Sequence, residues 1–174
     1  DQRQPVHLER ELDRAIATLT DGMDPSKLTI QKMYAGDTCV LALPDQLRQA
    51  FTNVLMNAVQ AMKGQGALRL STALADTSVV TTIADSGPAI PKQHLSKVFD
   101  PFFTTKGQGE GSGLGLTVAR RIIKKFGGDT RVESQKGNGT TCIVTLPIIP
   151  LSPPTQEASC AESPSRSTLQ PSPL

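Results

Sequence analysis

The spacing of apolar and polar positions predicts helices and strands that alternate along most of the chain. Apolar residues recur every three or four positions over 8–19, 45–62 and 114–126, which predicts three amphipathic helices. Pro44 suits the first turn of the second helix, because proline has no N–H to leave unpaired there. A fourth, short helix is expected over 91–99.

Strict alternation of apolar and polar residues predicts the strands, which fall into three successive pairs. The turn Ala35-Gly36-Asp37 joins the first pair, a turn near Asp76 the second, and a glycine-rich turn the third. We therefore expect an α+β fold: a two-layer sandwich of a mixed, mostly antiparallel sheet of about five strands on about three helices. The six expected strands are 27–34, 38–43, 67–74, 78–85, 129–135 and 140–147.

Length and composition predict one folded domain with flanking segments. The chain has 174 residues and begins with Asp, which predicts a piece of a longer protein. The region 149–174 is rich in Ser and Pro and has no periodic apolar face, so we expect it to be disordered. Residues 21–148 are expected to form the domain, and residues 1–20 to be the end of a linker helix that leads into it.

The overall balance of residues argues against several classes of protein. A net charge of +2, one Tyr and no Trp do not favour nucleic-acid binding. No apolar run reaches 18 residues, so this segment is expected to make no membrane contact. Three widely spaced cysteines without a CxxC predict neither a metal site nor disulfides, and indicate a reducing, cytoplasmic setting.

Glycines at 107, 109, 111, 113 and 115 lead directly into the third amphipathic helix. Glycine lets the backbone bend closely around a ligand, and a helix start directs unpaired N–H groups at negative charge. This stretch predicts that the chain binds a nucleotide triphosphate.

The helix over 45–62 carries an unusual stripe of neutral amides at Gln49, Asn53, Asn57 and Gln60. A solvated stripe would normally hold Lys and Glu, which favour helices more than Asn does. Amide oxygens that face a cation are one interpretation, and a stripe hydrogen-bonded to a neighbouring loop is the other. The helix alone does not decide between them.

Asp85 ends an apolar strand and precedes a Ser-Gly-Pro turn. A carboxylate in that place would accept a hydrogen bond from an exocyclic amine such as that of adenine. Ordinary turn chemistry explains the same residues equally well.

Taken together, five motifs carry a resemblance that no single one does: NVLMNAVQAM, DSGPAI, VFDPFFTTK, GEGSGLGL and GNGTTCIVTLP. In this order they resemble the catalytic and ATP-binding domain of bacterial two-component sensor histidine kinases, in the gyrase, chaperone and kinase ATPase superfamily. The resemblance covers about residues 44–147 and implies the Bergerat ATP-binding fold.

The resemblance assigns roles to residues at the metal and adenine ends. It implies that the Asn57 oxygen ligates Mg²⁺ and that Asn53, one turn earlier, lines the phosphate side. Asp85 would bind the adenine amino group, Gly87 would let the backbone approach the base, and Ile90 would pack on it.

The resemblance also implies a lid over about 100–112 that closes on ATP. Phe102, with Phe103 beside it, would anchor the lid, and Lys106 would reach a phosphate. Thr140 would support the adenine pocket. The last glycine box would hold the phosphates through its backbone amides, and it consists of Gly111, Ser112, Gly113, Leu114, Gly115 and Leu116.

Two features depart from the family pattern. Ala89 stands where the pattern has Gly, and a positive φ there would make its Cβ costly by about 1 kcal/mol. Neither His7 nor His94 lies in a His-Glu or His-Asp box with a following Pro, so both are interpreted as ordinary surface or packing histidines. The phosphoacceptor histidine is therefore expected on a separate domain.

The sequence thus predicts a protein histidine kinase catalytic domain that uses ATP and Mg²⁺. Its expected partners are the dimerisation and histidine-phosphotransfer domain of its own parent protein and a response regulator receiver domain. Two alternatives remain: a serine protein kinase of the anti-sigma-factor type on the same fold, and a degenerate nucleotide-binding scaffold.

Overall fold

The computed structural model describes residues 2–36, 38–104 and 113–150 as strands and helices joined by turns and short connections. The strands are β1 (Gln4–His7), β2 (Leu28–Met33), β3 (Cys39–Ala42), β4 (Gly66–Ala75), β5 (Ser78–Asp85), β6 (Asp129–Gln135) and β7 (Gly139–Pro147). The helices are α1 (Leu8–Thr20), α2 (Pro44–Ala61), α3 (Lys92–Leu95) and α4 (Gly115–Lys125).

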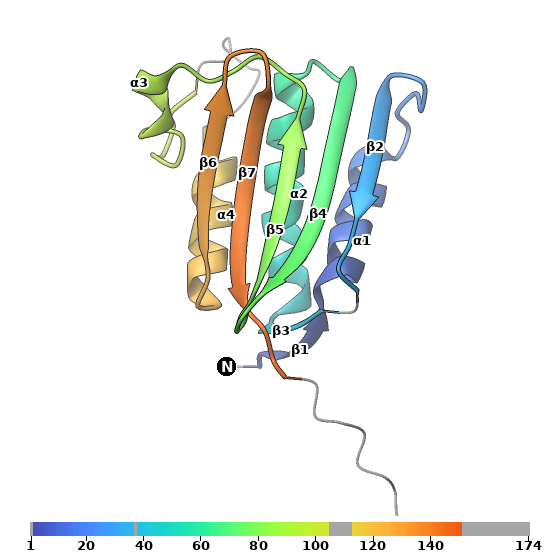
Figure 1. Cartoon of the computed structure of the whole chain (residues 1–174), viewed down its shortest axis with the longest axis vertical. Helices are drawn as coiled ribbons and strands as arrows, with labels where there is room; N and C mark the ends of the chain where they lie inside the picture. Colours follow the sequence, from blue (N-terminus) through green and yellow to red (C-terminus); the bar gives the residue numbers. More distant parts are fainter. Residues whose placement is uncertain (1, 37, 105–112, 151–174) are drawn as a thin grey trace, which may run out of the picture.

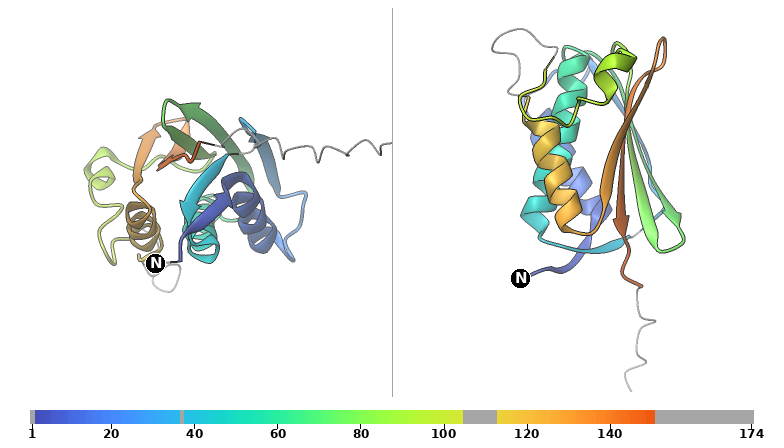
Figure 2. Two further views of the ribbon diagram at one scale, coloured as in Figure 1. Left: turned by 90° about the horizontal axis from the view of Figure 1, so that it is seen from below. Right: turned by 90° about the vertical axis from the view of Figure 1, so that its left-hand side faces the viewer.

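Two layers make up the molecule. A five-stranded sheet in the order β2-β4-β5-β7-β6 forms one layer, and α1, α2 and α4 lie side by side against one of its faces (Figures 1 and 2). All pairings in this sheet except β2 with β4 are antiparallel. The expected two-layer α+β sandwich is confirmed.

The core lies between the sheet and the three long helices. Alternate residues of β5 are buried, and Ile83 is 1% exposed. Phe51 of α2 faces the same layer and is fully buried, as are Leu55 of α2 and Leu68 of β4. The helix α2 packs against both α1 and α4, so its position fixes the other two helices.

The predicted pairing of the strands at 27–34 and 38–43 is wrong. Strand β2 runs parallel to β4, with Leu28 opposite Gly66. Parallel neighbours need a long crossover connection, and here β3 and α2 lie in that connection. Strand β3 instead pairs antiparallel with β1. Of the expected turn, Asp37 lies outside the described residues.

Strand β1 has no periodic signal in the sequence because it is four residues long and contains Pro5. It is formed by pairing with β3, where Val6 lies opposite Val40. The chain beyond β7 also reaches β3: the Ile149 N–H donates to the carbonyl of Cys39 at 2.9 Å. The division into 1–20, 21–148 and 149–174 stays a prediction.

A buried carboxylate joins the first helix to the sheet. Glu9, in the first turn of α1, is 6% exposed. Its two oxygens accept hydrogen bonds from the N–H and hydroxyl of Thr38 and from the hydroxyl of Thr72 on β4. These three donors compensate for the burial of the charge.

The hairpin between β6 and β7 turns at two glycines with positive φ, Gly137 and Gly139. Their surroundings differ sharply. A methyl group at Gly139 would lie 2.0 Å from the carbonyl oxygen of Asp85, whereas one at Gly137 would meet nothing within 4 Å. The backbone of β7 therefore approaches the end of β5 as closely as only glycine allows.

This difference predicts unequal costs for two alanine substitutions in one turn. Gly137→Ala should lower the free energy of unfolding by about 1 kcal/mol, because it suffers only backbone strain. Gly139→Ala adds overpacking against Asp85 and should cost about 2–4 kcal/mol in total. Urea unfolding of both variants measures the difference, and equal losses would contradict the close approach.

Candidate functional site

The predicted adenine-binding residues meet at one end of the sheet. Strands β5 and β6 end there and β7 begins there, at the upper end in Figure 1. Asp85 is the last residue of β5 and lies opposite Thr140, the second residue of β7. Both side chains are buried on the helix-covered side, at 7% and 8% exposed.

Asp85 is held by backbone donors. The Gly87 N–H donates to its Oδ1 at 2.9 Å, and the Thr140 N–H also donates to the carboxyl group. Burial raises the pKa of Asp85 above its ordinary value, and these two hydrogen bonds oppose that rise. A carboxylate kept dry and oriented in this way is a strong acceptor for a ligand N–H.

The segment that follows Asp85 lies against the end of α2. A methyl group at Gly87 would sit 3.3 Å from the backbone of Ala61, so glycine permits this contact. The Ser86 hydroxyl accepts from the Ala67 N–H at 2.9 Å and lies 3.4 Å from the sulfur of Met62. The loop is thus fixed to α2 on one side and to β4 on the other.

Ile90 closes the loop, and it does so through a residue that sequence reasoning missed. Its N–H donates to the Ser134 hydroxyl at 2.7 Å. Ser134 lies on β6 opposite Thr140, and the two hydroxyl oxygens are 3.0 Å apart. The predicted strands, 129–135 and 140–147, do not imply a pairing of Ser134 with Thr140, so the sequence offered no signal that would have found Ser134.

The amide stripe of α2 runs toward the start of α4. Asn53 and Asn57, its two middle members, are half-buried, whereas Gln49 and Gln60 at its ends are exposed. A methyl group at Gly115 would lie 3.9 Å from both Cβ and the carbonyl oxygen of Asn53. The first turn of α4 is therefore next to the asparagines.

No side chain caps the start of α4, where Leu114 is the N-cap residue. The first N–H groups of that helix have no intrahelical acceptor and carry the positive end of its dipole. Leu114, Gly115 and Leu116 are all half-buried there. The arrangement suits a negatively charged group between α2 and α4.

Phe102 and Gly113 are in contact. The Phe102 N–H donates to the Gly113 carbonyl at 3.0 Å, and a methyl group at Gly113 would clash with the Phe102 backbone. The Phe102 ring is 74% exposed, whereas Phe103 packs edge-on against His94 at 5.5 Å. The predicted residues Lys106, Gly111 and Ser112, and most of the expected lid 100–112, lie outside the described residues.

The backbone of Ala89 does not have the positive φ that would make its Cβ costly. Among the described residues other than glycine, positive φ occurs at Lys63, Asp76 and Phe102, and not at Ala89. Ala89 is half-buried, and its Cβ carries no left-handed strain.

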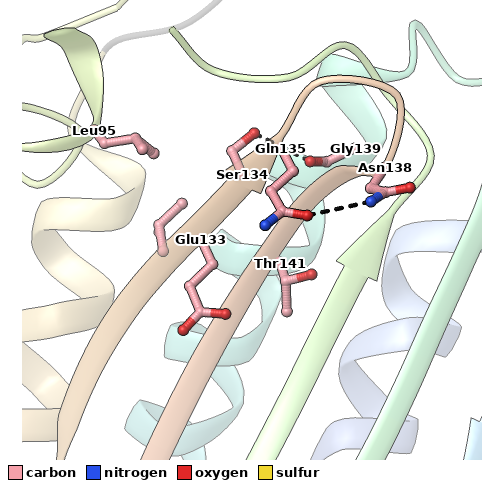
Figure 3. A pocket seen from close by; sticks show the side chains of 8 residues that line it. Leu95, Glu133, Ser134, Gln135, Asn138, Gly139 and Thr141 are labelled. Atoms are coloured by element: carbon pink, nitrogen blue, oxygen red, sulfur yellow. Dashed lines mark hydrogen bonds between the residues drawn. The ribbon is translucent and has the colours of Figure 1, made fainter. Parts of the chain in front are cut away.

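A hollow of about 430 Å³ lies beside the hairpin rather than among these residues (Figure 3). Leu95 of α3 borders it, together with residues of both hairpin strands. Figure 3 shows Glu133, Gln135 and Thr141 along it. Ser134 and Gly139 also line this hollow, whereas Asp85, Gly87, Ile90 and Thr140 do not.

The donor set bears on whether Mg²⁺ fits. Within the described ranges, no three His, Cys, Asp or Glu side chains cluster to hold a metal by themselves. An Mg²⁺ ion typically takes one or two protein oxygens and fills its shell with phosphates and water. The half-buried Asn57 amide fits that role.

No helix among the described residues is long and apolar enough to cross a bilayer.

Comparison with known proteins gives consistent results. Sensor histidine kinase ZraS of Escherichia coli (strain K12) is 32% identical over 83% of this chain, which spans 31% of ZraS. The solved structure of the mycobacterial sensor histidine kinase MprB superposes with a TM-score of 0.76 at 27% identity, covering 86% of this chain and 99% of that one. The catalytic domain of histidine kinase ThkA gives 0.75 at 28% identity, covering 84% and 96%.

The match to a family of proteins covers more than half of the chain. Residues 42–150 fit the histidine kinase-, DNA gyrase B- and HSP90-like ATPase family. The α2 stripe, the Asp85 loop and the β6–β7 hairpin all lie inside that range. The chain therefore belongs to the histidine kinase-, DNA gyrase B- and HSP90-like ATPase family.

Proposed function

We propose that this chain is the ATP-binding catalytic domain of a sensor histidine kinase. It transfers the γ-phosphoryl group of ATP to a histidine on the dimerisation and phosphotransfer domain of its parent, for relay to a response regulator receiver domain. The buried, backbone-held carboxylate of Asp85 at the end of β5 is the observation that carries the proposal. The chain spans about a third of the length of ZraS, so the phosphotransfer activity of the whole kinase is part of this proposal.

Asp85 binds the adenine end. Its carboxylate accepts from the exocyclic amine of the base, and its burial strengthens that hydrogen bond relative to one in water. Gly87 allows the base to approach the backbone, Ile90 packs on the ring, and Thr140 supports Asp85 through its N–H. A guanine presents a carbonyl where adenine has its amine, so the ionised carboxylate rejects it.

The phosphates lie between α2 and the start of α4. Asn53 lines the phosphates, and Asn57 holds Mg²⁺. The backbone N–H groups of the glycine box, which includes Gly113, Leu114, Gly115 and Leu116, bind the negatively charged phosphate oxygens. When bound, Mg²⁺ neutralises charge on the phosphate oxygens. We propose three further contributions at the phosphate end. Lys106 reaches a phosphate, the backbone amides of Gly111 and Ser112 bind the phosphates, and the lid anchored at Phe102 closes on ATP.

The transfer itself asks the domain mainly for positioning. An imidazole nitrogen of the acceptor histidine forms a bond to the γ-phosphorus while the bond to the β,γ-bridging oxygen breaks, and ADP leaves with that oxygen. The neutral imidazole supplies its own electron pair, so no strong base is needed on this chain.

The two histidines of this chain lie in other surroundings than the residues around Asp85. His7 lies in β1 opposite Cys39, and His94 packs against Phe103. Neither belongs to the Asp85 group, which supports a phosphoacceptor elsewhere. The serine-kinase alternative is not favoured by relatives that are sensor histidine kinases, and the scaffold alternative loses its main argument because Ala89 is unstrained.

Asp85→Asn should weaken ATP binding strongly without weakening the fold. The amide keeps an oxygen for the Gly87 and Thr140 N–H groups but presents an NH₂ group to the adenine amine. We expect ATP affinity to fall about 100-fold or more, since a buried unpaired donor and a lost charged acceptor both contribute. Calorimetric titration with ATP measures it, with Asp129→Asn on exposed β6 as the control.

The pH dependence of the same site follows from the raised pKa of Asp85. A carboxyl whose pKa is higher in the folded state favours folding when protonated and opposes it when ionised. At pH 7, Asp85→Asn should therefore unfold at the same or a higher urea concentration than the natural protein. ATP binding by the natural protein should weaken on acidification from a pH above 3.8; binding unchanged down to pH 3.8 would contradict this account.

Asn57→Ala should remove the Mg²⁺-dependent part of ATP affinity and leave the rest. Without its metal ligand, ATP binding in MgCl₂ should drop to the level measured in EDTA, a loss of about 10-fold or more. Gln49→Ala, on the same stripe but exposed, is the matched control. A loss of equal size in EDTA would instead show that Asn57 acts on the fold.

Phosphotransfer distinguishes the kinase from its alternatives. With γ-³²P-labelled ATP, the chain alone should gain no stable label, whereas the separately produced phosphotransfer domain of the parent should be labelled in its presence. Phosphohistidine is acid-labile, so the label should be lost in acid. A label at His7 or His94, or an acid-stable phosphoserine, would refute the proposed reaction.

A further inference from the structure

We propose that Ser134 is the positioning residue for adenine recognition: its single hydroxyl holds the Ile90 loop and the Thr140 strand together around Asp85. This inference rests on the proposed function and adds a residue that touches neither phosphate nor metal. Ser134 is half-buried near the end of β6, at the edge of the five-stranded sheet.

Asp85, Thr140 and Ser134 form one row across three strands. Asp85 pairs with Thr140, and Thr140 pairs with Ser134. Because directly paired residues point to the same side of a sheet, all three side chains lie on the helix-covered face. The row therefore connects the carboxylate of β5 to the hydroxyl of the edge strand.

The Ser134 hydroxyl uses its full hydrogen-bonding capacity. Its oxygen accepts from the Ile90 N–H at 2.7 Å, and its proton is directed at the Gly139 carbonyl at 3.0 Å. The Thr140 hydroxyl, 3.0 Å away, then donates to the second lone pair. One donor and two acceptor positions are filled, by groups from the loop, the turn and the strand.

These partners are the ones that shape the adenine end. Ile90 is four residues beyond Ser86, at the far end of the loop that follows Asp85. The hydrogen bond from its N–H to the Ser134 hydroxyl joins this loop to the sheet. Gly139 touches the Asp85 carbonyl, and Thr140 donates its N–H to the Asp85 carboxyl group. Without Ser134 the Ile90 N–H loses its acceptor, and the loop that carries Gly87 is free to move away from the base.

The experiment compares Ser134→Ala, Ser134→Thr and Ser71→Ala. Threonine keeps the hydroxyl, and Ser71 is half-buried on β4, away from the row. Each variant and the natural protein are titrated with ATP and with GTP. Ser134→Ala should raise the dissociation constant for ATP about 5- to 30-fold and lower the preference for ATP over GTP, as expected for a lost acceptor at a buried donor.

Ser134→Thr should restore most of the affinity, and Ser71→Ala should bind as the natural protein does. In the nucleotide-free protein, hydrogen exchange of the Ile90 amide should be faster in Ser134→Ala alone. This measurement separates a local effect from general destabilisation, which would speed exchange throughout β5 and β7.

Unchanged ATP affinity and ATP preference in Ser134→Ala, with a natural protein that binds ATP, would overturn this inference alone. Failure of Ser134→Thr to restore either would overturn it as well. A natural protein that binds no ATP would overturn both the inference and the proposed function.

Discussion

The close approach of β7 to the last residue of β5 organises the candidate site. Gly139 brings its backbone against the carbonyl of Asp85, where any side chain would collide. That contact places Thr140 beside the carboxyl group and lets its N–H donate to it. It also sets the register in which Ser134 reaches the returning loop. A single glycine thus decides how three strands and one loop meet.

Burial of the Asp85 carboxylate at this contact has an electrostatic cost when no ligand is bound. A carboxylate buried to 7% exposed loses much of its hydration, and two backbone N–H groups compensate only in part, since the pKa of Asp85 is still raised. A ligand amine in that place would complete the set of donors. At the other end, no side chain caps the first turn of α4, which carries the positive end of the helix dipole. The two ends are thus complementary to a base with an amine and to a phosphate chain.

The sequence predicted the elements better than their pairing. The helices α1, α2 and α4 and the hairpins β4–β5 and β6–β7 follow from periodicity and short turns, since both depend on local residues. The partner of β2 could not be predicted, because its pairing with β4 is set by the α2 crossover and not by any neighbouring turn. Likewise, β1 forms only because β3 offers it an edge.

The site shows a similar limit. Asp85, Gly87 and Thr140 were found because they occur in motifs, but the role of Ser134 depends on a contact with Ile90, 44 positions away. No local pattern encodes such a contact. The concern over Ala89 depended on a backbone angle that a sequence does not supply. Motifs therefore located the ligand-facing groups, and the fold was needed to find what holds them.

Amide spectra of the ¹⁵N-labelled chain, titrated with ATP and MgCl₂, test the central claim most directly. If Asp85 and its neighbours bind the base, the amide signals of Gly87, Ile90 and Thr140 shift together and saturate with one dissociation constant. If the signals that shift are instead those of Glu133 and Thr141, along the hollow beside the hairpin, the base does not bind at Asp85 and the account is wrong.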